Sequence, residues 1–75
     1  MKIKLSRHAK RRARLYKISE SLIHDILGNT ELPRGRHEVI KEVEGFSFPL
    51  KIVINIESDI ITVITCYPVK KGRKQ

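Results

Sequence analysis

Apolar residues occupy every second position from Phe46 to Ile56, and a second apolar stretch, from Ile60 to Tyr67, follows after Ser58 and Asp59. Alternation with a period of two is typical of a β-strand with one covered face, and so short a gap between two such stretches predicts a hairpin. Pro49 cannot donate a hydrogen bond to a ladder, so the first stretch is expected to begin at a sheet edge or a bulge. The C-terminal half is therefore predicted to form an antiparallel sheet.

A third, more charged strand is predicted from His37 to Glu44. With a two-residue turn in the hairpin, Ile52 lies opposite Thr65. Leu50 then lies opposite Tyr67, and both polar residues share the face of the alternating isoleucines. A three-residue turn would reverse this assignment, because a shift of one residue exchanges the two faces of a strand. The register therefore stays open at this point.

Two helices are predicted before these strands. Ser6 is a suitable N-cap for the first, whose apolar residues recur at helical spacing, and Ser19 is a suitable N-cap for the second, which is expected to end near Gly28. The apolar stripe of the first helix consists of Leu5, Ala9, Ala13 and Tyr16. Residues 29–35 are expected to form a loop, and residues 1–5 a short edge strand or the lead-in to the first helix.

These elements predict an α+β fold in which two N-terminal helices pack on one face of a three- or four-stranded antiparallel sheet. The uncovered face is expected to carry Lys51, Asn55 and Thr62. Residues 1–69 are predicted to form a single domain, and residues 70–75 a basic C-terminal tail. A chain of 75 residues buries a thin core, so a homodimer that adds to this core is a further expectation.

Positive charge is concentrated at the two ends of the chain. The first 17 residues carry eight Lys or Arg and no acid, and the tail KKGRKQ adds four more, whereas residues 18–68 hold eight acids against four bases. The net charge of +8 therefore belongs to the ends. Such an asymmetry favours a phosphate-rich partner, and RNA is the partner we expect.

Several classes of site and location are disfavoured by the composition. A single cysteine, Cys66, cannot form an internal disulfide, and the three scattered histidines do not complete a metal-binding spacing, so neither a metal nor another cofactor is expected. The longest apolar stretch is interrupted by charged and polar residues, and the N-terminus has no signal-peptide pattern. We therefore expect a soluble, cytoplasmic protein without a membrane partner.

The chain also resembles a family of very small bacterial and archaeal domains of unknown function, whose pattern is HAxxR, an Arg-Gly-Ile-Ser corner and a terminal Val-Ile-Thr-x-Tyr-Pro strand. That family is similar in turn to the ribonuclease toxins of the RelE and BrnT types, which implies a RelE-like two-layer sandwich that binds RNA. One departure is that Tyr16 and Lys17 stand where the pattern has Arg-Gly, so Arg14 either replaces that arginine or the chain lacks it. The matching segments are His8-Ala9-Lys10-Arg11-Arg12, Ile18-Ser19, Lys51-Ile52-Val53-Ile54 and Val63-Ile64-Thr65-Cys66-Tyr67-Pro68.

Metal-free cleavage of RNA needs a base, an acid and fixed positive charge at the phosphorus. His8 and Arg12, four residues apart on a predicted helix, can address one phosphate, and Tyr67 or Thr65 can complete the catalytic group. His37 is a further candidate beside Arg36. The residues expected to bind the nucleic acid are Lys10, Arg11, Arg14, Arg36, Lys51, Lys70, Lys71 and Arg73.

Three functions are compatible with these features, and the first is the one that we expect. The first is a metal-independent endoribonuclease of toxin type, cleaving RNA by attack of the 2′-hydroxyl and held in check by an acidic antitoxin. The second is a non-catalytic RNA- or DNA-binding module, in which phosphate contacts dominate because aromatic residues for base stacking are few. The third is an oligomerising interaction domain, favoured by the apolar strand and by a sheet edge that can pair with another chain.

Overall fold

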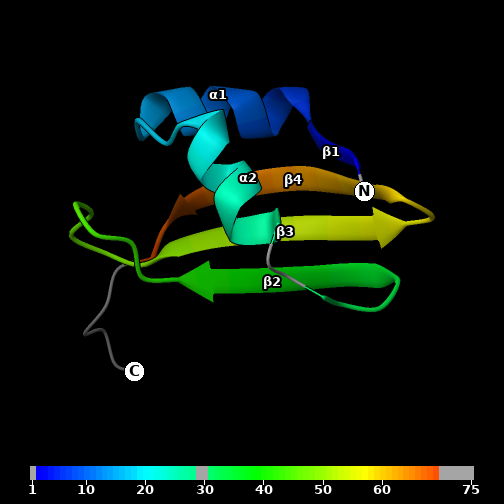
Figure 1. The fold of residues 1–75 in the computed structure, drawn as a ribbon. Coiled ribbons are helices and arrows are strands. Elements are labelled where there is room, and N and C mark those ends of the chain that lie inside the picture. Colours follow the sequence, from blue (N-terminus) through cyan, green and yellow to red (C-terminus); the bar gives the residue numbers. More distant parts are fainter. Residues whose placement is uncertain (1, 29–30, 70–75) are drawn as a thin grey trace.

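The computed structural model describes residues 2–28 and 31–69. Two helices lie on one side of a four-stranded sheet, so the α+β class is confirmed (Figure 1). The elements in chain order are β1 (Lys2–Leu5), α1 (Arg7–Leu15), α2 (Glu20–Gly28), β2 (Gly35–Lys41), β3 (Leu50–Glu57) and β4 (Ile60–Pro68).

The sheet is mixed, and the prediction of a purely antiparallel sheet was wrong. Its strand order is β1-β4-β3-β2, with β1 parallel to β4 and the other neighbours antiparallel. The parallel pair is extended at both ends, since Lys2 N–H donates to the carbonyl of Asp59 (2.8 Å) and Ser6 N–H donates to that of Val63 (3.0 Å). The short alternating segment at the N-terminus is thus an edge strand, one of the two structures that its pattern allowed.

Helix α1 begins as predicted at the Ser6 cap, where the side-chain oxygen accepts the N–H of Ala9. Ala9 and Ala13 are buried, and their small side chains allow the helix to lie close to the sheet. This close approach places Sγ of Cys66 3.8 Å from the carbonyl oxygen of Ala9, to which the thiol donates. The predicted apolar stripe is therefore the face that α1 buries.

The corner between the helices is a tight C-terminal cap centred on Lys17. Ile18 N–H donates to Ala13 O (2.8 Å) and Lys17 N–H to Arg14 O (3.3 Å), the two hydrogen bonds of a Schellman motif. This motif requires a left-handed residue, and Lys17 has a φ of 59°. Glycine adopts this conformation without strain, so the lysine is held here at some cost in backbone conformation.

Helix α2 is capped by Ser19, whose side-chain oxygen accepts the N–H of Leu22 at 3.0 Å, as its sequence predicts. Its buried residues are Ile23 and Leu27. They complete a core with Ile18 and the covered face of the sheet, whose buried members are Leu50, Ile52, Ile54, Ile56, Ile61, Val63 and Cys66.

Two strand boundaries differ from the predictions. Strand β2 covers residues 35–41 rather than 37–44, and β3 begins at Leu50 rather than Phe46. The segment between them turns back at Gly45, which has a φ of 94°, and Phe46 N–H donates to the carbonyl of Val43 at 3.1 Å. Pro49 then separates this loop from the ladder, so the two phenylalanines belong to the loop.

The register of the β3–β4 hairpin decides the faces of Thr65 and Tyr67, which the sequence leaves open. The turn does consist of Ser58 and Asp59, but Ile64 is an extra residue in β4, so Val53 pairs with Thr65 while Ile54 pairs with Val63. The bulge shifts the rest of β4 by one position, and side chains of paired residues lie on the same face. Both polar residues therefore lie on the uncovered face, away from the alternating isoleucines.

Candidate nucleic-acid interface

Helix α1 presents its basic side chains on the side away from the core. At about 100° per residue, His8 and Arg12 share one flank of the helix, Lys10 and Arg14 share the other, and Arg11 projects between them. All of these except the half-buried Arg12 are exposed. The outer surface of α1 is thus mainly cationic, although Leu15 is also exposed there, and four of its predicted nucleic-acid or catalytic cations lie together.

The positive charge of α1 is not compensated within the described part of the chain. The helix contains no acid, and among residues 2–28 and 31–69 no carboxylate forms an ion pair with its arginines or with Lys10. Clustered like charges repel one another unless a counter-charge lies nearby. A bound polyanion would supply that counter-charge.

His8, Arg12 and Tyr16 form a row along one flank of α1. Arg12 Nε donates to His8 Nε2 at 3.4 Å, and Arg12 Nη1 donates to the hydroxyl oxygen of Tyr16 at 3.5 Å. Both distances are long for hydrogen bonds, so these contacts orient the guanidinium weakly and can be exchanged for contacts with a phosphate. The structure thus brings together the predicted pair His8 and Arg12 and adds Tyr16 to it.

Ser6 fixes the position of this helix on the sheet. Its hydroxyl accepts the N–H of Ala9 and donates to the carbonyl oxygen of Ile64 at 2.9 Å. Ile64 is the bulge residue, so its carbonyl lies outside the regular register and is satisfied by the helix cap. One side chain therefore joins the start of α1 to the irregular point of β4.

Thr65 and Tyr67 are not part of the group on α1. They lie on the uncovered face of the sheet, whereas α1 packs on the covered face through Ala9 and Ala13. Tyr67 pairs across the ladder with Lys51, whose ammonium lies 5.9 Å from the centre of the tyrosine ring. The four predicted catalytic residues thus divide into two pairs on opposite faces of the sheet.

The ammonium of Lys51 is already paired with a carboxylate. Its Nζ lies 3.0 Å from Oε1 of Glu38, and this hydrogen bond raises the pKa of Lys51 above its ordinary value. Its charge is therefore partly compensated without a ligand, in contrast to the charges on α1. Arg36 is exposed on the same uncovered face, opposite Asn55.

The remaining candidates are structural or lie outside the described residues. His37 Nε2 lies 2.7 Å from the carbonyl oxygen of Pro33, so this nitrogen donates and the imidazole fixes the start of β2 to the preceding loop. Cys66 is completely buried, and burial raises the pKa of its thiol. Lys70, Lys71 and Arg73 of the predicted tail lie outside the residues that the structure describes.

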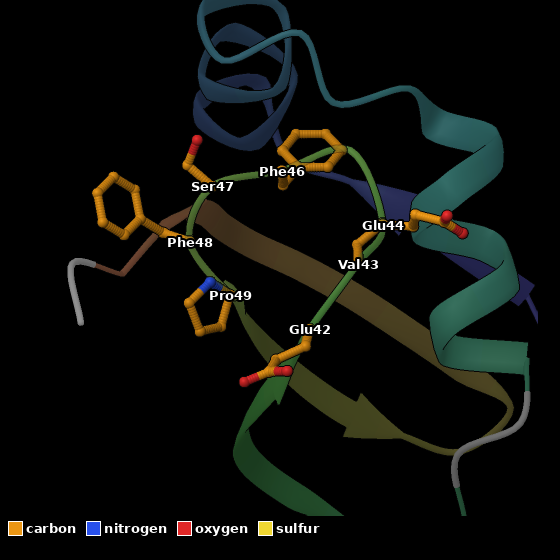
Figure 2. A pocket seen from close by; sticks show the side chains of 7 residues that line it. All are labelled: Glu42, Val43, Glu44, Phe46, Ser47, Phe48 and Pro49. Atoms are coloured by element: carbon orange, nitrogen blue, oxygen red, sulfur yellow. The ribbon is translucent and has the colours of Figure 1, made fainter. Parts of the chain in front are cut away.

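The loop between β2 and β3 forms a hollow of about 370 Å³, which residues 42–44 and 46–49 line. Figure 2 shows that Glu42 and Glu44 point in different directions, as do Phe46 and Phe48. The carboxylates therefore do not converge as a paired acid and base would. In the described ranges no cluster of three or more acidic, histidine or cysteine side chains could hold a metal ion, and no helix is long and apolar enough to cross a membrane.

Comparison of the chain with protein families, curated proteins and solved structures finds no match. The RelE-like arrangement therefore stays a prediction. The sequence predicts Tyr16 in the apolar stripe and not as a partner of Arg12, although their spacing of four residues on a helix is a signal that joins them. It also does not predict the contact of Ser6 with Ile64, which no local pattern reveals.

Proposed function

We propose that the protein binds RNA through phosphate contacts made by α1. The observation that carries this proposal is the uncompensated charge of the helix: an exposed cationic surface with no acid in its sequence and no ion pair among the described residues. Arginine suits the role because its planar guanidinium can bind two phosphate oxygens at once. The choice of RNA over DNA rests on the family resemblance, whereas the geometry supports binding of either phosphate backbone.

Binding of this kind depends steeply on salt, because each phosphate contact releases counterions. Four contacts to single-stranded RNA correspond to a slope of about −3 in a plot of log affinity against log salt concentration. We expect this slope in fluorescence-anisotropy titrations of a labelled mixed-sequence RNA, with the same sequence as DNA in parallel. Affinity that does not change with salt would contradict phosphate contacts as the source of binding.

Two double variants with the same change in net charge test the location of the site. Arg11→Gln with Arg14→Gln removes two charges from α1, whereas Arg34→Gln with Lys41→Gln removes two exposed charges near the two ends of β2. The first is expected to weaken binding by about tenfold or more and to reduce the salt slope by about 1.4, because two phosphate contacts are lost. Equal effects of the two double variants would refute α1 as the interface.

Metal-independent cleavage is the second candidate, and the contact of Arg12 with His8 favours it. In this reaction His8 takes the proton of a 2′-hydroxyl, which attacks the adjacent phosphorus, and Arg12 stabilises the charge that develops on the phosphate oxygens. The hydroxyl of Tyr16, on the other side of Arg12, is the group in this row that can protonate the leaving 5′-oxygen. Thr65 and Tyr67 take no part in this version of the site.

Incubation of the protein with the labelled RNA in EDTA tests cleavage separately from binding. His8→Ala and His24→Ala form a matched pair, because both histidines are exposed on helices and only His8 lies beside Arg12. Fragments that disappear with His8→Ala and persist with His24→Ala would support catalysis at this site. Binding without fragments in any sample would leave the protein as a non-catalytic RNA-binding module.

The proposal extends to a protein partner and a location. An acidic protein of antitoxin type would cover α1 by the same charge complementarity as RNA, so the two ligands would compete. We propose a cytoplasmic location for the protein, because RNA is present there as a ligand. Displacement of labelled RNA by a candidate acidic partner, with no displacement by a neutral protein of similar size, is the expected result.

A further inference from the structure

Leu15 is an exposed apolar residue within the cationic surface of α1. Its side chain is 65% exposed, more than the two other exposed large apolar residues of the described ranges, Ile40 at 59% and Leu32 at 36%. At about 100° per residue, Leu15 projects from the same side of the helix as Arg11 and roughly opposite to the buried Ala13. The leucine therefore points away from the core, into the surface that we propose for RNA.

Three planar side chains precede Leu15 along this surface. Arg11 and Arg12 lie four and three residues before it, a spacing that places Cβ atoms about 5–6 Å apart on a helix. His8 lies about 10 Å further back along the helix axis. Unpaired bases stack on imidazole and guanidinium planes and pack against apolar side chains. This side of α1 thus offers contacts to bases as well as to phosphates.

Double-stranded RNA could not use the apolar contact. Its bases are stacked inside an A-form helix whose major groove is too deep and narrow for side chains to read, so α1 would meet mainly phosphates and riboses. Leu15 would then lie against charged and polar groups. In a single strand, by contrast, a base can turn toward Leu15 while its phosphate reaches Arg11, which forms no ion pair in the described part of the chain.

We propose that α1 selects single-stranded RNA, with Leu15 packing against an unpaired base while the neighbouring arginines bind the flanking phosphates. This inference rests on the proposed function, because it assigns the ligand class of the same surface. Charge alone predicts the opposite preference, since each phosphate contact with a duplex releases more counterions than a contact with a single strand. Tighter binding of the single strand therefore reports contacts with bases.

A short labelled RNA, alone and annealed to its complement, tests this preference by fluorescence anisotropy at one salt concentration. The protein is expected to bind the single strand about fivefold more tightly than the duplex. Leu15→Gln keeps a good helix former but removes the apolar contact, so it is expected to abolish the preference and leave duplex binding unchanged. Ile40→Gln is the matched control, because it removes a similarly exposed apolar side chain from β2 and is expected to change neither affinity.

A strand in which stable abasic spacers replace the bases shows whether the partner of Leu15 is a base. The wild type and Leu15→Gln are expected to bind this strand equally. Duplex binding as tight as single-strand binding, equal effects of Leu15→Gln and Ile40→Gln, or a loss by Leu15→Gln on the abasic strand as large as on RNA would overturn the inference. Each of these outcomes leaves phosphate binding by α1 intact, whereas absence of salt-dependent binding to either RNA would refute the proposed function and this inference with it.

Discussion

Removal of the Ser6 hydroxyl is the sharpest test of how α1 is held on the sheet. Ser6→Ala removes the acceptor for the N–H of Ala9 and the donor to the carbonyl of Ile64. Loss of an N-cap costs about 1 kcal/mol, and loss of one further hydrogen bond costs about 1 kcal/mol. We therefore expect the free energy of unfolding to fall by about 2 kcal/mol, and the melting temperature by about 8–16 °C for a domain of this size.

Ser19 is the matched control, because its hydroxyl caps α2 through Leu22 and forms no hydrogen bond to the sheet within residues 2–28 and 31–69. Ser19→Ala is expected to cost about 1 kcal/mol, so the difference between the two alanine variants measures the bond to Ile64. Aspartate variants distinguish the cap hydrogen bond from the hydrogen bond to Ile64. Aspartate caps a helix well but cannot donate, so Ser6→Asp is expected to destabilise the protein while Ser19→Asp leaves its stability unchanged or raised.

Urea unfolding followed by circular dichroism gives these free energies, and unchanged m-values would show that only stability has changed. Equal losses for Ser6→Ala and Ser19→Ala would refute the argument that the cap of α1 satisfies the bulge. A Ser6→Asp variant as stable as the wild type would also refute this argument. RNA binding by Ser6→Ala, measured well below its melting temperature, is expected to weaken as well, because the helix loses its attachment to β4.

Two further predictions concern conformation and ionisation. Lys17→Gly is expected to raise the free energy of unfolding by about 1 kcal/mol, because glycine adopts the left-handed φ without strain. Lys17→Ala removes the same charge but is not expected to stabilise the protein. A comparison of the urea midpoints of the two variants therefore separates the effect of backbone conformation from the effect of charge. The raised pKa of Cys66 means that the folded state holds the thiol proton more tightly than the unfolded state does. Its contribution to stability is therefore complete below the ordinary pKa of 9.0 and is lost as the pH rises toward the folded value. Stability profiles from about pH 8 to pH 10 should fall less steeply for Cys66→Val, and parallel profiles would contradict the role of the thiol.

The helix boundaries were predictable because their signals are local. Ser6 and Ser19 accept backbone N–H groups three residues later, and this requirement can be read from the sequence without knowledge of the sheet. The cationic surface of α1 and its contact between His8 and Arg12 were predictable for the same reason, since residues four apart on a helix share a flank.

The faces of β4 were not predictable, because one extra residue in a ladder has no sequence signature in this chain. The alternation that identified the hairpin is compatible with Ile64 inside or outside the register. The predicted catalytic residues are therefore not brought together, because the bulge places Thr65 and Tyr67 on the face opposite the helices. The alternation also predicts a strand for residues 46–49, which belong to the loop, because their apolar residues keep the period of two beyond the end of the ladder.

The sequence by itself determined the α+β composition, both helix starts and the cationic surface of α1, since each depends on residues within a few positions of one another. Only the tertiary structure decided that β1 runs parallel to β4, that Ser6 satisfies the bulge, and that β2 is the last strand of the sheet among the described residues. These features join segments as many as 58 residues apart. Their energies arise from pairing and packing between distant backbone groups, which the local pattern of side chains does not specify.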